Sequence, residues 1–332
     1  MVFSSEITSS FSESVDIYNI GNYYNRFNIY NKSINKLTKI NKFKCLVPLQ
    51  DNKFSVDNTN IILKKRIGSN SRYGIVYLSN INNNKFVTKL TQINKYNLNE
   101  IIIAKKLSDI TINDINPHFL IIYKFFICNN NLEVINLPKL IKNNDYYMSI
   151  NELVSGNFKN FLNSAYINSD LLLNALQQIL ISILAFHHFT NGLFHNDCHY
   201  KNFLFHRIKP GGYFHYKIYG KDVYIKNLGY LWIIWDFGLA RKESEYTKRR
   251  LEDYFRITSF FLKYNNNLYF NDKDADLIKI VNNILEFKQT FYRLFNNSDQ
   301  LFMEELFKIP KLFSFKIPIK SKIVNKSPYI IT

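Results

Sequence analysis

The feature that most constrains the fold is an apolar helix that leads directly into a dense run of polar and ring-bearing side chains. Across residues 171–190 apolar residues recur at helical spacing, and the segment GLFHNDCHYKNFLF follows at once. The most apolar stretch, residues 171–186, is interrupted by Asn174, Gln177 and Gln178, so we do not expect it to span a bilayer. The pattern indicates a globular protein in which a core helix is followed by a loop that carries chemically active side chains.

The rest of the chain changes from strand-like to helical patterning. Residues 61–90 contain three β-like runs, IILKKRI, GIVYLS and KFVTKL, separated by turn residues as in an antiparallel meander. Residues 99–107 are expected to form a helix, and residues 118–128 and 146–154 are expected to form buried strands joined by the Asn-rich loop 129–145. Strands followed by mostly helical segments predict an α+β protein with a β-rich first lobe and a helical second lobe.

We expect three parts along the chain. Residues 1–58 are rich in Ser, Asn, Tyr and Lys and have weak periodicity, so they are interpreted as an N-terminal extension. Residues 59–154 would form the β-rich lobe and residues 155–332 the helical lobe, the latter with an insert at 207–230 and a basic C-terminal tail. The insert contains a Pro-Gly-Gly turn and alternating aromatic residues, which suggest extra strands.

The formal net charge of +17 is unevenly placed. One acid-free run holds Lys32, Lys36, Lys39, Lys42 and Lys44. Another, residues 308–326, holds six lysines without an acid. Such surfaces attract polyanions, so we expect a protein substrate of acidic character and electrostatic contact with nucleic acid or an anionic membrane. A bias toward Lys, Asn and Ile throughout the chain accounts for part of the excess.

The cysteines and the first residues bear on the compartment. Cys45, Cys128 and Cys198 lie far apart with no metal-type spacing, which suits free thiols in a reducing compartment and predicts neither disulfides nor structural zinc. The first residues carry an early Glu6 and lack the basic start and apolar stretch of a secretory signal. We therefore expect a cytoplasmic protein.

Two motifs after the apolar helix carry the chemistry. In the first, Asp197 lies two residues after His195, and Asn202 lies five residues after Asp197. In the second, Asp236-Phe237-Gly238 follows the apolar strand predicted at residues 230–234. Together and in this order, they resemble the catalytic loop H-R-D-x-x-x-x-N and the D-F-G motif of protein kinases. The resemblance covers about residues 61–264 and implies the two-lobed protein-kinase-like fold.

The β-rich region resembles the kinase nucleotide site less closely. Residues 67–77 resemble the glycine-rich loop without its middle glycine, and Val87-Thr88-Lys89 resembles V-A-I-K. Glu100 is the only acid between Lys89 and Ser108, which makes it the candidate ion-pair partner of Lys89. The segment Glu152-Leu153-Val154 resembles the hinge that binds adenine through its backbone. The resemblance thus assigns ATP binding to Gly68, Ser69, Asn70, Ser71, Gly74, Val76, Lys89, Glu152 and Val154.

The resemblance also implies a role for each polar residue in phosphoryl transfer. Asp197 would orient the attacking hydroxyl or accept its proton, and Asn202 and Asp236 would hold Mg²⁺, or Mn²⁺, against ATP. Lys89 would neutralise phosphate charge and be kept in place by an ion pair with Glu100. Positioning and charge neutralisation are what this reaction asks of a protein.

Supporting residues are expected around these motifs. By the same resemblance, His195 would brace the loop against Asp236 and Phe237. Residues 251–262 resemble the central helix of the second lobe, whose early Asp253 anchors the catalytic loop. One helical face of this segment is apolar, as a buried helix requires. His187, in the apolar helix, is interpreted as an ordinary helix residue.

Departures from the protein-kinase pattern leave three hypotheses open. Asn196 stands where many protein kinases have Arg, and His199 stands where they have a lysine that contacts the transferred phosphate. The pattern H-x-D-x-H-x-x-N also resembles small-molecule kinases of the choline and aminoglycoside type. A degraded glycine-rich loop and the lack of A-P-E keep a pseudokinase scaffold as the third hypothesis.

The leading hypothesis is a viral serine/threonine protein kinase. The insert 207–230, with HNDCHYKNFLF before it and WIIWDFGLAR after it, is similar to the kinases of large DNA viruses, of the poxvirus and giant-virus type. The bias toward Asn, Ile and Lys fits an AT-rich viral genome. Such a protein would be found in the host cytoplasm or in the virion.

Overall fold

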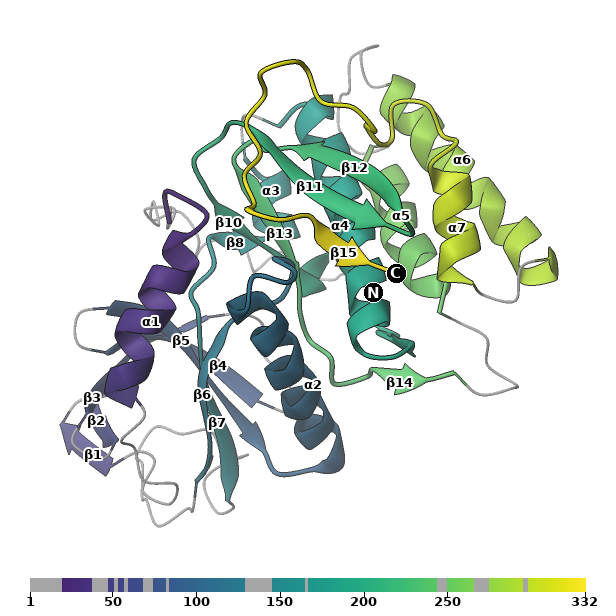
Figure 1. The fold of residues 1–332 in the computed structure, drawn as a ribbon. Helices are drawn as coiled ribbons and strands as arrows, with labels where there is room; N and C mark the ends of the chain where they lie inside the picture. The colour runs from purple at the N-terminus through teal and green to yellow at the C-terminus, as the bar shows by residue number, and fades with distance from the viewer. Residues whose placement is uncertain are drawn as a thin grey trace, which may run out of the picture.

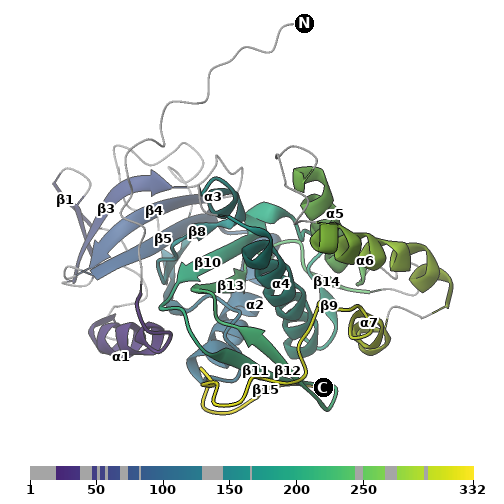
Figure 2. The ribbon, with the colours of Figure 1, turned by 90° about the horizontal axis from the view of Figure 1, so that it is seen from above.

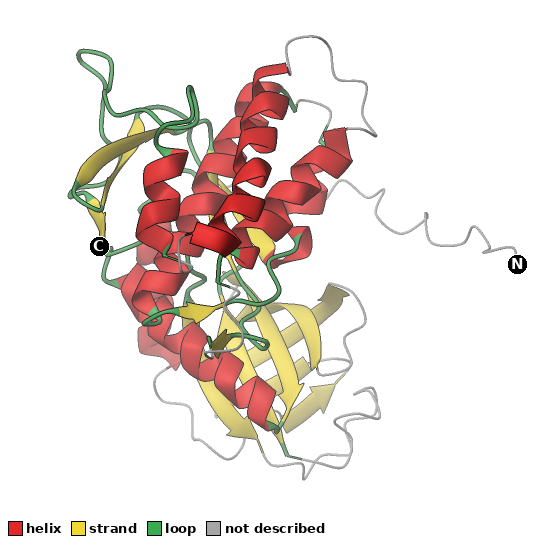
Figure 3. Cartoon of the chain, turned by 90° about the vertical axis from the view of Figure 1, so that its right-hand side faces the viewer, coloured by secondary structure: helices red, strands yellow, loops and turns green. Residues whose placement is uncertain are grey.

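A β-rich part and a mainly helical part make up the structure (Figure 1). In Figure 3 the large sheet lies at one end, crossed by one long helix, and most of the helices lie at the other end. The chain is therefore of the mixed kind, with strands and helices largely segregated, that its sequence predicts. The computed structural model describes residues 20–37, 47–50, 53–56, 59–67, 74–81, 84–128, 145–164, 167–243, 250–265, 275–294 and 298–332.

The β-rich part is built on a seven-stranded sheet in which neighbouring strands run antiparallel. Its order is β1-β2-β3-β4-β5-β7-β6, so β7 lies between β5 and β6. In β5 the buried side chains of Phe86, Thr88 and Leu90 alternate with the partly exposed Val87 and Lys89, the period of two expected of a strand with one face on a core. The strands are Val47–Gln50 (β1), Lys53–Val56 (β2), Thr59–Ile67 (β3), Gly74–Ile81 (β4), Asn84–Gln92 (β5), Ile122–Cys128 (β6) and Tyr146–Asn151 (β7).

One long helix, α2 (Lys95–Ile112), accompanies this sheet. Asn94 caps its N-terminus, because the Asn94 side chain accepts a hydrogen bond from the backbone N–H of Asn97 at 2.9 Å. Its buried residues include Ile103 and Leu107, which pack into the hydrophobic core and so fix the helix in place. The helix thereby brings Glu100 toward β5.

The mainly helical part surrounds α4 (Ser169–Phe189), whose side chains are almost all buried beyond its first turn. By length and apolar composition, α4 is the one helix among the described residues that could cross a membrane, but 72% of its most apolar window is buried inside the protein. It therefore serves as a core helix, as its interrupting polar residues predict. The other helices are Phe158–Leu162 (α3), Glu252–Asn265 (α5), Ala275–Leu294 (α6) and Asp299–Leu306 (α7), with the 3-10 turn Tyr200–Asn202 (η1).

Two small sheets position the motif-bearing loops. The three-stranded sheet β13-β10-β8 places Trp232 in an aromatic core, where its ring lies 5.1 Å from Phe158 and 5.0 Å from Phe161. A two-stranded sheet, β14-β9, ties the start of the first motif to the segment after the second. These strands are Gly156–Asn157 (β8), Leu193–Phe194 (β9), Phe203–Arg207 (β10), Tyr230–Ile234 (β13) and Arg241–Lys242 (β14).

The insert between β10 and β13 forms a hairpin of β11 (Tyr213–Ile218) and β12 (Lys221–Lys226), so the predicted extra strands are present. Phe214, Tyr216 and Ile218 alternate toward the core and are fully buried. The strand β15 (Tyr329–Ile331) adds to β11 in parallel (Figures 1 and 2). Residues far apart in the sequence therefore share one three-stranded sheet.

Part of the predicted N-terminal extension belongs to the fold. The helix α1 (Asn25–Leu37) lies beside the sheet and contacts β6 (Figure 2). Tyr23 and Arg26 are buried, with 2% and 1% of their surface exposed. The strands β1 and β2 continue the sheet beyond β3. The weak periodicity of residues 1–58 did not indicate this, because α1 is polar apart from one face.

The cysteines differ from expectation. Cys198 is a free, buried thiol, whereas Cys128, at the end of β6, is disulfide-bonded. The prediction of free thiols throughout is therefore wrong for Cys128. Spacing along the chain could not reveal this bond, because the fold and not the sequence interval decides which cysteines meet.

Candidate active site

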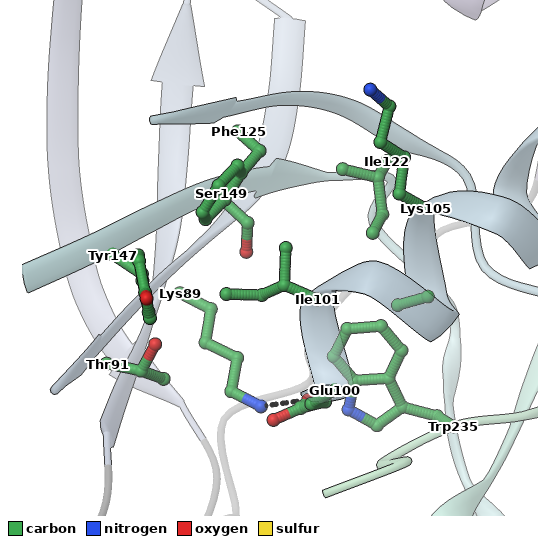
Figure 4. A pocket seen from close by; sticks show the side chains of 11 residues that line it. Lys89, Thr91, Glu100, Ile101, Lys105, Ile122, Phe125, Tyr147, Ser149 and Trp235 are labelled. Atoms are coloured by element: carbon green, nitrogen blue, oxygen red, sulfur yellow. Dashed lines mark hydrogen bonds and ion pairs between the residues drawn. The ribbon is translucent and has the colours of Figure 1, made fainter. Parts of the chain in front are cut away.

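Lys89 and Glu100 form an ion pair between the sheet and α2 (Figure 4). The Nζ atom of Lys89 lies 2.5 Å from Oε1 of Glu100, and both side chains are largely shielded from solvent. The ammonium also lies over the ring of Trp235, 5.2 Å from its centroid. The pair expected from the sequence is thus formed, and it joins a strand, a helix and the segment that carries the second motif.

Asp236 lies close enough to act on this pair. Burial opposes the charged form of Lys89, but the Glu100 and Asp236 carboxylates outweigh it and raise the pKa of Lys89. A side chain at Gly238 would come within 3.8 Å of Oδ1 of Asp236 and 3.9 Å of Oε2 of Glu100, so both carboxylates flank this glycine. Lys89 is therefore a stable ammonium that faces two carboxylates.

A small pocket opens beside the ion pair. Apart from the pair itself its wall is mainly apolar and aromatic, and in Figure 4 the ammonium of Lys105 points away from the pair. The charge inside the pocket is therefore concentrated at Lys89 and Glu100. The lining residues are Lys89, Thr91, Glu100, Ile101, Ala104, Lys105, Ile122, Phe125, Tyr147, Ser149 and Trp235.

The loop that follows β9 carries the first motif. Asp253, in the first turn of α5, accepts hydrogen bonds from the backbone N–H groups of His195 at 2.6 Å and Asn196 at 2.9 Å. Asn196 has a φ of +63°, in the left-handed region that residues other than glycine rarely adopt. Asp253 thus anchors the loop, as expected, in a backbone conformation that would not persist without support.

Asp197 presents a carboxylate that is held from both sides. Nη2 of Arg256 lies 3.0 Å from its Oδ1, and Nε2 of His199 lies 3.3 Å from its Oδ2. Asn202 donates from Nδ2 to the backbone oxygen of Asp197 at 2.9 Å and to Oδ2 at 3.3 Å. Burial alone would raise the pKa of Asp197, but His199 and then Arg256 outweigh it and lower that pKa. The group is an ionised carboxylate within reach of solvent.

Asp236 begins the second motif with a second left-handed residue, at a φ of +70°. The ring of Phe237 is buried and stacks on Phe186 of α4, with centroids 5.2 Å apart. Nε2 of His195 lies 2.9 Å from the backbone oxygen of Trp235, and the His195 ring packs edge-on against Phe237. Strained residues held in this way occur often at functional sites.

Asn202 and Asp236 lie at the same end of two paired strands. Phe203 of β10 opposes Ile234 of β13, and the backbone N–H of Trp235 donates to the backbone oxygen of Asn202 at 3.0 Å. One carboxylate and one amide oxygen suit Mg²⁺, which binds oxygen and takes its other ligands from phosphates and water. Among the residues that the structure describes, no group of three or more His, Cys, Asp or Glu side chains could hold a metal ion.

The residues assigned to the glycine-rich loop are described only in part. Gly74 begins β4, where an added Cβ would lie 2.5 Å from Cγ2 of Thr91 and 2.7 Å from the backbone oxygen of Leu90, so strand packing alone requires a glycine there. Val76 opposes Lys89 in register, which places both side chains on one face of the sheet. The remaining assigned residues of this loop lie outside the described residues: Gly68, Ser69, Asn70 and Ser71.

Glu152 and Val154 lie in the connection between β7 and β8. The backbone N–H of Glu152 donates to the backbone oxygen of Ile121 at 2.9 Å, so this amide is not available to a ligand. The Glu152 carboxylate is buried and is paired with Arg26. The side chain of Glu152 is therefore committed to the fold, whereas Leu153 and Val154 are partly exposed.

Sequence reasoning missed two residues that support the site. Arg256 reaches Asp197, and a signal existed, because Arg256 lies one helical turn after Asp253. His187, treated as an ordinary helix residue, bridges Asp253 at 3.0 Å and Asp299 at 2.8 Å. Burial lowers the pKa of His187, but the two carboxylates outweigh it and raise that pKa to about 9. Nothing near His187 in the sequence marks this role.

Comparison with solved structures finds similarity to a kinase domain. One such structure is that of the BubR1 kinase domain, with a TM-score of 0.39 and 18% sequence identity. The match covers 67% of this chain and 61% of the kinase-domain chain. No protein-family model and no curated protein matches the sequence.

Proposed function

We propose that this protein is an ATP-dependent phosphotransferase with the two-lobed protein-kinase-like fold, and that it is a viral serine/threonine protein kinase. The observation that carries the proposal is the shielded pair of Lys89 and Glu100 beside Asp236. Removing such charges from water costs several kcal/mol per ion before their attraction compensates. A purely structural ion pair therefore contributes little net stability to the fold. Binding of a polyphosphate by Lys89 explains why the charge is kept there.

The chain's own residues would divide the work of phosphoryl transfer. Lys89 would bind phosphate oxygens of ATP, and Glu100 would keep its ammonium in place. Asp236 and Asn202 would hold Mg²⁺, or Mn²⁺, which neutralises phosphate charge when bound. Asp197 would orient the acceptor hydroxyl and take its proton as the γ-phosphoryl group passes to the hydroxyl oxygen and ADP leaves.

The acceptor distinguishes two candidate functions. The insert 207–230 and its flanking motifs favour a viral protein kinase, whose basic surface suits an acidic protein substrate. The placement of His199 beside Asp197 favours the second candidate, a small-molecule kinase of the choline or aminoglycoside type. A catalytically weak scaffold is the third outcome, and it would bind nucleotide without transferring phosphate.

The test is transfer of phosphate from γ-labelled ATP with Mg²⁺ to casein, to a basic protein and to a panel of small alcohols. We expect wild type to label protein, and we expect Asp197→Ala and Asp236→Ala to be inactive while circular dichroism shows an intact fold. A positioned base is worth about 10²- to 10⁴-fold in rate. Lys201→Ala is the matched control, because Lys201 is an exposed residue of the same loop.

The outcomes separate the hypotheses. Labelling of a small alcohol alone would establish the second candidate. Nucleotide binding without any transfer by wild type would indicate the scaffold. Transfer by Asp197→Ala at the wild-type rate and saturating ATP would overturn the assignment of the base.

A further inference from the structure

A buried guanidinium connects α1 to the connection between β7 and β8. Arg26 donates from Nε to Oε2 of Glu152 at 3.0 Å and from Nη2 to Oε1 at 2.5 Å. The same guanidinium donates to the backbone oxygens of Pro117 and Phe119, each at 2.8 Å. Its side chain has no exposed surface, so every one of these bonds lies inside the protein.

Glu152 is as fully engaged as Arg26. Its Oε1 also accepts from the backbone N–H of Ile121 at 2.8 Å, and its Oε2 lies 3.0 Å from Nε2 of His206 in β10. Burial would raise the pKa of Glu152, but Arg26 outweighs it and lowers that pKa to about 2. Burial lowers the pKa of His206 despite the nearby carboxylate, so His206 is a neutral donor. One carboxylate thus joins α1, the start of β6, residues 152–154 and β10.

Stability alone is a weak reason for such a cluster. The desolvation of a buried ion pair offsets much of its Coulomb attraction, and an apolar pair of the same volume often does as well. A planar guanidinium that binds a carboxylate through two nitrogens does fix distance and angle. Here it fixes Glu152, whose neighbours in the chain carry the proposed adenine-binding backbone.

We propose that Arg26 is a positioning residue of the nucleotide site. The helix α1, which carries Arg26, would then support this site and not only the stability of the fold. By holding the Glu152 carboxylate, Arg26 keeps the backbone of residues 152–154 in the conformation that receives the adenine ring. The inference rests on the proposed function, since it requires that this backbone contacts ATP. Loss of Arg26 should therefore weaken nucleotide binding more than it slows turnover.

The same helix region offers a matched control. The hydroxyl of Tyr23 donates to Oδ1 of Asp114 at 3.0 Å and accepts from the hydroxyl of Tyr329 at 2.8 Å. These bonds also secure the start of α1, but they do not involve Glu152. Tyr23→Phe removes them and leaves the Arg26 cluster in place, so it reports the effect of loosening α1 in general.

The experiment compares Arg26→Ala, Arg26→Lys and Tyr23→Phe in the full chain. The dissociation constant of Mg-ATP is measured by calorimetry, KM for ATP and kcat by the transfer assay, and the melting temperature by circular dichroism. We expect Arg26→Ala to raise Kd and KM about tenfold, equivalent to about 1.4 kcal/mol, with a much smaller change in kcat. Arg26→Lys, which keeps the charge without the fork, should lie between Arg26→Ala and wild type. Tyr23→Phe should lower only the melting temperature.

Two results would overturn the proposal. One is a folded Arg26→Ala protein with the nucleotide affinity of wild type. The other is a rise in KM for Tyr23→Phe that equals that of Arg26→Lys at the same melting temperature. If Arg26→Ala does not fold, Arg26→Lys and Glu152→Gln decide by the same criteria. A wild-type protein that binds no nucleotide at all would instead refute the proposed function.

Discussion

Lys89 keeps a positive charge in a place where burial alone would favour its neutral form. The Lys89 side chain is 16% exposed and that of Glu100 only 6%, so neither charge is well solvated. Removing one partner leaves the other uncompensated, which costs more than the pair contributes. The effect of substituting Lys89 must therefore be compared with the effect of substituting Glu100.

The first prediction at this scale concerns the ion pair of Lys89 and Glu100. Lys89→Met should reduce phosphate transfer by at least about 10²-fold, because a preorganised charge on the transferring group is lost. Glu100→Gln should be milder, since the amide oxygen can still accept a hydrogen bond from Lys89. Initial rates at saturating ATP measure both, and Lys105→Met is the control because Lys105 lines the same pocket and points away from the pair. A wild-type rate for Glu100→Gln beside an inactive Lys89→Met would show that Glu100 does not position Lys89.

Residue-level predictability depended on distance along the sequence. The pair of Lys89 and Glu100 could be predicted because the two residues lie 11 positions apart in adjacent elements, and only one acid was available. Arg26 and His187 could not be predicted, because their partners Glu152 and Asp299 lie 126 and 112 positions away. A single sequence carries no signal for such pairs.

Among the elements, α5 connects the chemistry to the core. Leu251, just before it, and Tyr254, Phe255 and Thr258 within it are buried as the helical spacing predicted, and Asp253 holds the motif loop. The imidazole of His187 in α4 contacts Asp253 of α5 and Asp299 of α7, so it joins these three helices. Of the helices that carry this contact, α4 and α5 were predicted from their periodicity. In contrast, β15 has only three residues, too few to show a pattern.

The second prediction is a loss of stability at alkaline pH through His187. Its pKa is about 9 in the folded protein and about 6.5 in the unfolded chain. A raised pKa means that the stabilisation is fully present below about pH 6.5 and is lost as the pH rises through about 9. The size is roughly 3 kcal/mol.

Urea unfolding of wild type and His187→Gln at about pH 6 and about pH 9.5 tests this prediction. The difference in unfolding free energy between the two proteins should be large at the lower pH and small at the higher one. His188→Gln, at the neighbouring and less buried position, should show no such trend. A difference that does not change with pH would contradict the charged bridge.

At the scale of the whole molecule, positive charge gathers near the end of the chain. All the lysines of residues 308–326 are exposed, and Lys308 and Lys311 are paired with Glu305 and Asp276. The other predicted run begins at Lys32 and lies mostly outside the described residues. The tail is therefore the surface on which the predicted electrostatic contact can be tested.

The third prediction is salt-dependent binding of polyanions by this tail. The triple change of Lys316, Lys320 and Lys322 to Glu should lower the salt concentration at which the protein elutes from heparin, because it reverses three exposed charges. Lys105→Glu with Lys106→Glu, on exposed positions of α2, is the control. Equal elution of the triple variant and wild type, or retention that salt does not weaken, would count against a docking role for the tail.

The pairing of β11 with β15 has a consequence during synthesis. The backbone N–H of His215 donates to Oδ1 of Asn325, 110 positions later, beside the β11–β15 pair. Ribosomes add about 5 to 20 residues per second, so the insert waits roughly 5 to 20 s for this partner. Until then β11 presents an unpaired edge, which is a template for association with other chains. The interval in which the insert has emerged from the ribosome and β15 has not is therefore one in which this protein is prone to associate with other chains.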